Sequence, residues 1–298
     1  MEQFIDPKIL ARVKDLQLVA RTVGDGFLQG IQCSHQRGVG IEFSQYRTYE
    51  PGDEPGRIDW KLYARSDRYF VREADRESEI SVVFVLDASG SMAQQSEGGA
   101  WSKFACARTL LATLAYLAQH QGDRAGLLCL SDTGVDSLPA TAGERQWHRI
   151  LRHLHAAQPA GRFPAAHRLK AFFPRLQAAE LVVFISDFHE SSDEILSFVH
   201  TINSTRNDIL ALQLLCNDEL RFPWHGPTRF EDLETGDSVL LSAQSARAAY
   251  LEALSASQNQ LRSQLGRYEV GLESFNVDAP LDGALHHVLK HRQQRLRA

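Results

Sequence analysis

A run of hard oxygen ligands follows an apolar stretch in the first third of the chain. Asp87, Ser89 and Ser91 come directly after Ile80–Leu86, so one short turn carries a carboxylate and two hydroxyls at alternate positions. Oxygen ligands of this kind suit a magnesium-type ion. If the apolar stretch is a buried strand, the turn lies at the carboxyl edge of a sheet, where open α/β folds bind ligands. The spacing therefore predicts a divalent-cation site.

A second aspartate has the same position relative to another apolar stretch, because Asp187 directly follows Leu181–Ser186. Two strands at the switch point of a doubly wound sheet lie side by side, so Asp87 and Asp187 would face each other across one crevice. Mg²⁺ usually keeps several waters, and we expect an open coordination position there. A single strand-end Asp or Ser is a common helix cap, but the combination favours a metal site. His189 is expected to be an ordinary loop histidine.

An enzymatic alternative uses the same residues, with Asp87 as the nucleophile of a metal-dependent phosphohydrolase or phosphotransferase. That chemistry usually needs a second carboxylate two residues on, where this chain has Ser89, and a lysine near Asp187, which the sequence does not show. The sequence also lacks a Gly-x-x-x-x-Gly-Lys-Ser/Thr loop and a Gly-x-Ser-x-Gly turn. We therefore predict no catalytic residue and a binding protein rather than an enzyme. A third possibility is a metal-free structural subunit.

The elements that must position these residues alternate along the chain. Apolar runs predict strands at 80–86, 125–131, 181–186, 209–216 and 268–276, a short antiparallel partner at 135–138 and a hairpin at 230–241. Helical periodicity predicts helices at 6–23, 102–121, 144–156, 165–178, 191–204, 243–266 and 281–297, the first of them stopped by Gly24 and Gly26. This alternation indicates an α/β fold, with a doubly wound, mainly parallel sheet and helices on both faces.

Residues 37–79 differ from the rest of the chain. They hold 18 charged residues in 43, interleaved with aromatic residues, and their periodicity is poor. A disordered tail would hold fewer aromatic residues, so we expect irregular structure with short strands. We therefore divide the chain into an N-terminal helix and charged segment, residues 1–79, packed on a main domain of residues 80–298.

The overall composition limits the classes of binding partner and the cellular location that we expect. A net charge of −5 gives no electrostatic reason to bind nucleic acid or an anionic membrane. The N-terminus does not resemble a signal peptide, and no apolar stretch approaches the ~20 residues of a membrane span. None of the four cysteines forms a Cys-x-x-Cys pair, which fits a reducing compartment. We expect a cytoplasmic protein without membrane insertion.

Two sequence blocks carry a resemblance to a known family. The first reads Arg37-Gly38-Val39-Gly40-Ile41-Glu42-Phe43, Arg47-x-Tyr49-x-Pro51-Gly52-Asp53, Arg57-Ile58-Asp59-Trp60 and Ala64-Arg65, and the second is the Asp87 turn. From about residue 25 to the C-terminus, the chain resembles the bacterial family called domain of unknown function 58. The Asp87 turn itself resembles the metal-ion-dependent adhesion site of von Willebrand factor A-like domains.

The resemblance implies a von Willebrand A-like fold and a cytosolic adaptor or co-chaperone. It implies a MoxR-type AAA+ ATPase and a client protein as partners, with the metal site gripping a protein carboxylate. Candidate residues for docking the ATPase are Arg47, Asp53, Arg57, Arg65 and Arg162. The alternative for the charged segment is structural, because Arg–carboxylate pairs can clamp it to the sheet.

One departure from the adhesion-site pattern concerns a threonine ligand. Such sites usually take it from the loop before the helix that precedes the second aspartate strand, but residues 156–180 contain no Ser or Thr. The stretch offers Arg162 instead. An arginine in the crevice would either repel a cation or replace it by pairing with Asp87 or Asp187. The expected cofactor is therefore Mg²⁺ at an incomplete site.

Overall fold

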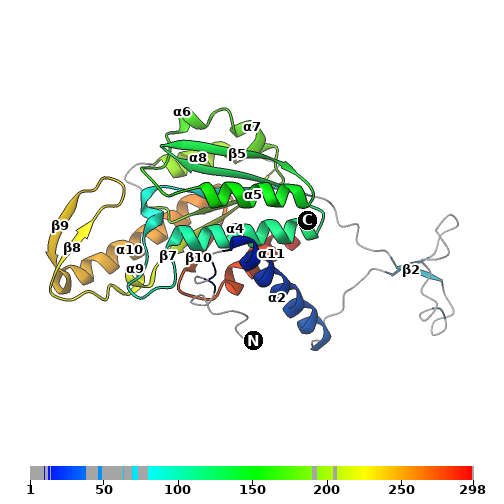
Figure 1. Ribbon diagram of the computed structural model, residues 1–298, viewed down its shortest axis with the longest axis horizontal. Helices are drawn as coiled ribbons and strands as arrows, with labels where there is room; N and C mark the ends of the chain where they lie inside the picture. Colours follow the sequence, from blue (N-terminus) through cyan, green and yellow to red (C-terminus); the bar gives the residue numbers. More distant parts are fainter. Residues whose placement is uncertain are drawn as a thin grey trace. The chain divides into compact units, whose positions relative to one another are not determined.

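The structure is a computed structural model (Figure 1) that describes residues 10, 13, 15–37, 46–48, 63, 69–72, 80–189, 193–203 and 207–296. The chain divides into two compact units. The first combines Met1–Phe27 with Glu79–Ala298, and the second is Leu28–Ser78. The first unit carries the sheet and the candidate site.

A six-stranded sheet organises the first unit. Its strands are β3 (Ser81–Asp87), β4 (Arg124–Ser131), β5 (Gly134–Thr141), β6 (Leu181–Ser186), β7 (Asp208–Leu215) and β10 (Gly271–Asn276), in the order β10-β7-β6-β3-β4-β5. All neighbours are parallel except β4 and β5. Counted along the chain, this order is 3-2-1-4-5-6, that of a doubly wound fold. The predicted fold class is confirmed.

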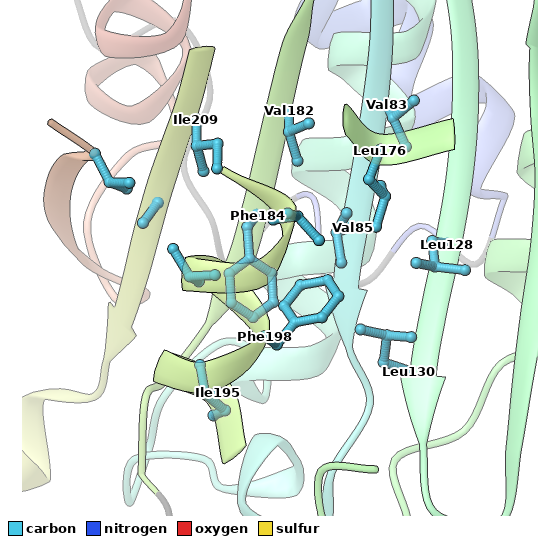
Figure 2. Packing of buried hydrophobic residues seen from close by; sticks show 14 of the residues in the cluster. Val83, Val85, Leu128, Leu130, Leu176, Val182, Phe184, Ile195, Phe198 and Ile209 are labelled. Carbon is cyan, nitrogen blue, oxygen red and sulfur yellow. The ribbon is translucent and has the colours of Figure 1, made fainter. Parts of the chain in front are cut away.

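Helices cover both faces of the sheet, as the fully buried central strands require. On one face α4 (Lys103–His120) packs with α5 (Glu144–Ala156) and α11 (Asp282–Leu296). The other face carries α6 (Ala166–Leu169), α7 (Phe173–Gln177), α8 (Glu194–Ile202) and the end of α10 (Ala243–Gly266). Figure 2 shows this second layer, where the rings of Phe184 on β6 and Phe198 on α8 have centroids 5.5 Å apart.

Two predicted helices differ from the observed ones. Residues 6–9, 11, 12 and 14 of the predicted helix 6–23 lie outside the described residues. Helix α2 (Leu16–Arg37) begins after Asp15, whose Oδ1 accepts hydrogen bonds from two backbone N–H groups of the first turn, and it runs through the predicted stop at Gly24 and Gly26. Gly24 is a packing position rather than a stop, because a Cβ there would lie 2.5 Å from the Tyr116 ring. The predicted helix 165–178 is two short helices, and Pro174, which lacks an N–H, lies in the first turn of the second.

The second unit is described only in part. Its strands β1 (Tyr46–Thr48) and β2 (Phe70–Arg72) pair antiparallel. Short strands were predicted for this part of the chain. The backbone of Arg47 belongs to β1. Three predicted docking residues, Asp53, Arg57 and Arg65, lie outside the described residues. The packing of residues 1–79 on the main domain stays a prediction.

Three smaller elements surround the candidate site. A 3₁₀ turn, η2 (Gly90–Ala93), follows β3, and helix α9 (Asn217–Arg221) follows β7. The hairpin of β8 (Pro227–Glu231) and β9 (Ser238–Ser242), with a tip at residues 232–237, confirms the predicted hairpin. Along the described parts of the chain, no helix combines the length and the apolar character that a membrane span requires.

Candidate functional site

The candidate metal ligands meet where β3 and β6 end. The two strands are parallel neighbours, with Leu86 opposite Ile185, so Asp87 and Asp187 emerge at the same edge, both with 0% exposure. The Ser89 and Ser91 hydroxyls lie 3.1 Å apart, and the Ser91 hydroxyl donates a hydrogen bond of 3.2 Å to Asp187 Oδ1. The structure thus brings all four predicted residues together.

Asp87 is held in an environment that disfavours its charge. Its Oδ2 accepts a 2.6 Å hydrogen bond from the Ser186 hydroxyl, and its Oδ1 accepts one of 2.9 Å from the Ser89 backbone N–H. These bonds favour the carboxylate, but burial and then the negative charge of Asp187 raise the pKa of Asp87 to about 7. Among the residues that the structure describes, no Lys, Arg or His forms an ion pair with Asp87, which is therefore a buried acid without a neutralising cation from this part of the chain.

Asp187 has such a cation. Lys103 Nζ lies 3.0 Å from Asp187 Oδ2 and 2.7 Å from Glu219 Oε1, and the Lys103 side chain is fully buried. Burial alone would raise the pKa of Asp187, but the Lys103 ammonium, together with His189, holds that pKa well below its usual range. The two aspartates are thus inequivalent, since Asp187 is a neutralised anion and Asp87 is not.

Two predictions about the surroundings of Asp187 were wrong. A lysine does lie near it, and His189 is not an ordinary loop histidine. The His189 backbone N–H donates a 3.1 Å hydrogen bond to Asp187 Oδ1, and its Nδ1 lies 3.4 Å from Glu219 Oε1. Although burial opposes it, hydrogen bonding to Asp187 raises the pKa of His189.

The sequence reasoning missed Lys103, Glu219 and Ser186. Glu219 had a weaker signal, because it lies three residues after the predicted strand 209–216, whereas Asp187 directly follows its own strand. Its Oε2 accepts a 2.6 Å hydrogen bond from the Cys216 N–H, which fixes it at the edge of the sheet. Lys103 had none, since a lysine in the first turn of a helix is ordinarily exposed.

A further carboxylate reaches the site from the hairpin tip. The Glu234 carboxylate is half-buried near Ser91, and burial, then Asp187 and Asp232, raise its pKa, whereas Ser91 lowers it. The tip also touches the turn after β3, because a Cβ at Gly90 would lie 2.4 Å from the Leu233 carbonyl oxygen. The sequence had shown these residues only as a turn.

The loop expected to supply a threonine meets the Asp87 turn through its backbone. The Gly90 N–H donates a 2.7 Å hydrogen bond to the Gly161 carbonyl, and the Ala160 N–H donates one of 2.9 Å to the Ala88 carbonyl. Arg162 itself is exposed, and the charges it influences are those of the hairpin tip, where it lowers the pKa of both Asp232 and Glu234.

One of the two alternatives for Arg162, pairing with an aspartate, is not found. Within the described residues no ion pair joins Arg162 to Asp87 or Asp187, and the cation beside Asp187 is Lys103.

The family description "Protein of unknown function DUF58" matches residues 45–260. The chain belongs to this family. Among its relatives are the uncharacterized proteins Mb1516 of Mycobacterium bovis and Rv1480 of Mycobacterium tuberculosis, each 27% identical to this DUF58 protein over 236 residues, which cover 78% of this chain and 73% of theirs.

Solved structures that resemble this DUF58 protein include two at 13% identity. One is BatB from Bacteroides thetaiotaomicron, a conserved hypothetical protein, with a TM-score of 0.47 over 73% of this chain and 98% of that one. The other is the SpRpn10 VWA domain, with a TM-score of 0.39 over 70% and 95%. We take the fold class from the strand order and not from these structures.

The donor set of the DUF58 site fits a hard cation. In the parts of the chain that the structure describes, no group of three or more His, Cys, Asp and Glu residues could hold a metal by itself. Magnesium needs only one or two carboxylates, with hydroxyls and waters completing its shell. Asp87, Ser89 and Ser91 offer that set, and the raised pKa of Asp87 marks the place where positive charge is missing.

An aromatic pocket of about 870 Å³ opens beside this site. Ser91, His189 and Glu219 form its polar end, and its apolar walls come from the segment after α9, from α10 and from the hairpin. The aromatic residues among them are Phe222, Trp224, Phe230 and Tyr250. The cluster of oxygen donors therefore lies next to an apolar surface, a combination typical of sites that fix one polar group of a larger partner.

Proposed function

We propose that this DUF58 protein is a non-catalytic interaction module that binds a carboxylate of a partner protein through a Mg²⁺-type ion. The observation that carries the proposal is the convergence of Asp87, Ser89, Ser91 and Asp187 at the edge between β3 and β6. Asp87 and the two hydroxyls would hold the ion. Asp187, already neutralised by Lys103, orients the Ser91 hydroxyl. The ion supplies positive charge and a free coordination position.

We infer the partner from the family resemblance. The family resemblance implies an adaptor or co-chaperone role with a MoxR-type AAA+ ATPase and its client, in the cytoplasm. We propose Arg162 as a docking residue, because it is exposed at the rim of the site. Arg47, Asp53, Arg57 and Arg65 remain candidates in the charged segment. Association with a MoxR-type ATPase of the same organism should weaken in EDTA and in the Asp87→Ala variant.

Calorimetry with Mg²⁺ and Mn²⁺ at near-neutral pH tests the metal site directly. We expect binding by the wild type and none by Asp87→Ala. The matched control is Asp136→Ala on β5, which removes a carboxylate that contacts His153 and not the site, and this variant should bind as the wild type does. If the wild type binds neither ion, the protein is a metal-free structural subunit and the proposal fails.

The alternative function, a metal-dependent phosphohydrolase or phosphotransferase, requires a lysine near Asp187, and Lys103 lies there. Lys103 does not favour it, since its ammonium is fully buried and already contacts Asp187 and Glu219. Such an ammonium is not available to a phosphate ester. Turnover of p-nitrophenyl phosphate that disappears in Asp87→Asn would support the enzyme and refute the binding module.

A further inference from the structure

The tip of the β8–β9 hairpin has a defined shape of its own. Asp232 Oδ1 accepts hydrogen bonds from the backbone N–H groups of Glu234 (2.8 Å) and Thr235 (3.3 Å). Gly236 adopts a φ of 76°, and its N–H donates a 2.7 Å hydrogen bond to the Asp232 carbonyl. Glu234 is therefore presented by a turn that is ordered before it meets any partner.

This turn brings the Glu234 carboxylate to the candidate metal ligands. The Leu233 carbonyl, next to Glu234, lies against Gly90 on the 3₁₀ turn that carries Ser91. No bulkier residue than glycine at position 90 would allow this approach. This contact places the tip over the end of β3, with Glu234 near Ser91.

The approach is electrostatically unfavourable without an additional positive charge. Glu234 lies in the field of Asp187, and the Asp87 carboxylate accepts a hydrogen bond from the Ser89 N–H, two residues from Ser91. Lys103 is already shared by Asp187 and Glu219, and Arg162 is exposed to solvent, which weakens its effect. A cation between Asp87 and Glu234 would turn this like-charge repulsion into an attraction.

The hairpin itself is weakly anchored. Every residue of β9 is exposed, with Leu240 at 68%, whereas β8 is anchored through Phe230, whose ring stacks on Phe222 with centroids 5.5 Å apart. Segments with few buried apolar contacts open at low free-energy cost. The tip can therefore leave the site without disturbing the sheet.

We propose that Glu234 is an internal ligand of the ion at Asp87, and that the carboxylate of a partner takes its place. This inference rests on the proposed function. Leu233 lies beside Glu234 and lines the aromatic pocket. A partner segment that displaces the tip would accordingly carry an acidic residue next to an apolar one.

Hydrogen exchange of the full chain, with Mg²⁺ or with EDTA, tests the inference. Mg²⁺ should slow exchange of the amides of residues 232–237 about tenfold in the wild type. It should have no effect on them in Glu234→Gln, although calorimetry still detects the ion. Glu231→Gln, an exposed neighbour on β8, is the matched control and should behave as the wild type.

The outcomes separate the two proposals. Mg²⁺ binding without slower exchange of the tip, or with the same slowing in Glu234→Gln, overturns the internal ligand and leaves the metal site intact. Absence of Mg²⁺ binding overturns both.

A second probe is the hexapeptide Asp-Leu-Glu-Thr-Gly-Asp. In Mg²⁺ it should bind Glu234→Gln at least about tenfold more tightly than the wild type, because the hairpin no longer competes. If the peptide binds both proteins with equal affinity, or binds neither, the proposal that a partner carboxylate replaces Glu234 is refuted.

Discussion

Replacing Asp87 by asparagine should stabilise the metal-free protein, although it removes the central residue of the site. The pKa of Asp87 rises from an ordinary 3.8 to about 7 in the folded chain. At about 1.4 kcal/mol per pKa unit, the buried charge costs up to about 4 kcal/mol above pH 7. Asparagine avoids that cost. It also leaves the Ser186 hydroxyl proton without its acceptor, a loss of about 2 kcal/mol. The net gain is about 2 kcal/mol.

The gain should depend on pH in a defined direction. Between pH 4 and 7 the folded chain keeps a proton on Asp87 that the unfolded chain has released, so the stability of the wild type falls as the pH rises. At pH 5.5 the cost of the charge is only about 2 kcal/mol, and the asparagine variant should match the wild type. At pH 8 the variant should unfold about 4–8 °C higher.

Thermal unfolding in EDTA and in excess Mg²⁺ provides the assay. Mg²⁺ should raise the melting temperature of the wild type only, because binding to the folded state stabilises it. The control is Asp278→Asn, whose carboxylate accepts hydrogen bonds from Ser96 and Asn217, and it should gain nothing at either pH. The reasoning is refuted if Asp87→Asn is less stable than the wild type in EDTA at pH 8.

Three further substitutions test the packing around the site, each by urea denaturation. Lys103→Met should lower the free energy of unfolding by about 3–5 kcal/mol, because it leaves Asp187 and Glu219 buried without their cation; a loss under 1 kcal/mol would contradict this. Phe184→Ala should cost about 3–5 kcal/mol through the cavity it leaves between β6 and α8, and an unchanged urea midpoint would contradict it. Gly24→Leu should cost about 1–3 kcal/mol by collision with the Tyr116 ring, whereas a mere helix stop at Gly24 would make the variant more stable.

The sheet and half of the site could be predicted because their signals are local. Continuous apolar runs identified the central strands, and the connections between them determined a doubly wound order. Asp87 and Asp187 follow their strands directly, so the position of the strand determines the position of the carboxylate. Glu219 obeys the same rule on β7, with one short turn between the strand and the residue.

The remaining features depend on contacts between distant segments. Gly24 carries the usual signal of a helix end, and only the Tyr116 ring, far along the chain, shows that it is a packing position. Lys103 is paired with carboxylates 84 and 116 residues away. Glu234 is brought near the Asp87 turn by a hairpin whose Leu233 carbonyl lies against Gly90. In each case the sequence gives the residue type but not the neighbour that determines its role.

The distribution of charge explains why a metal would bind at Asp87 and not at Asp187. Lys103 lies between Asp187 and Glu219 and contacts both carboxylates. The charge of Asp187 is therefore balanced within the protein and does not require a metal ion. The Asp87 side combines the buried acid with two hydroxyls and, from the hairpin, Glu234. If Lys103 were on the Asp87 side, it would fill the place of the ion. Under the proposed function, the location of Lys103 leaves the positive charge at Asp87 to be supplied by an ion from solution.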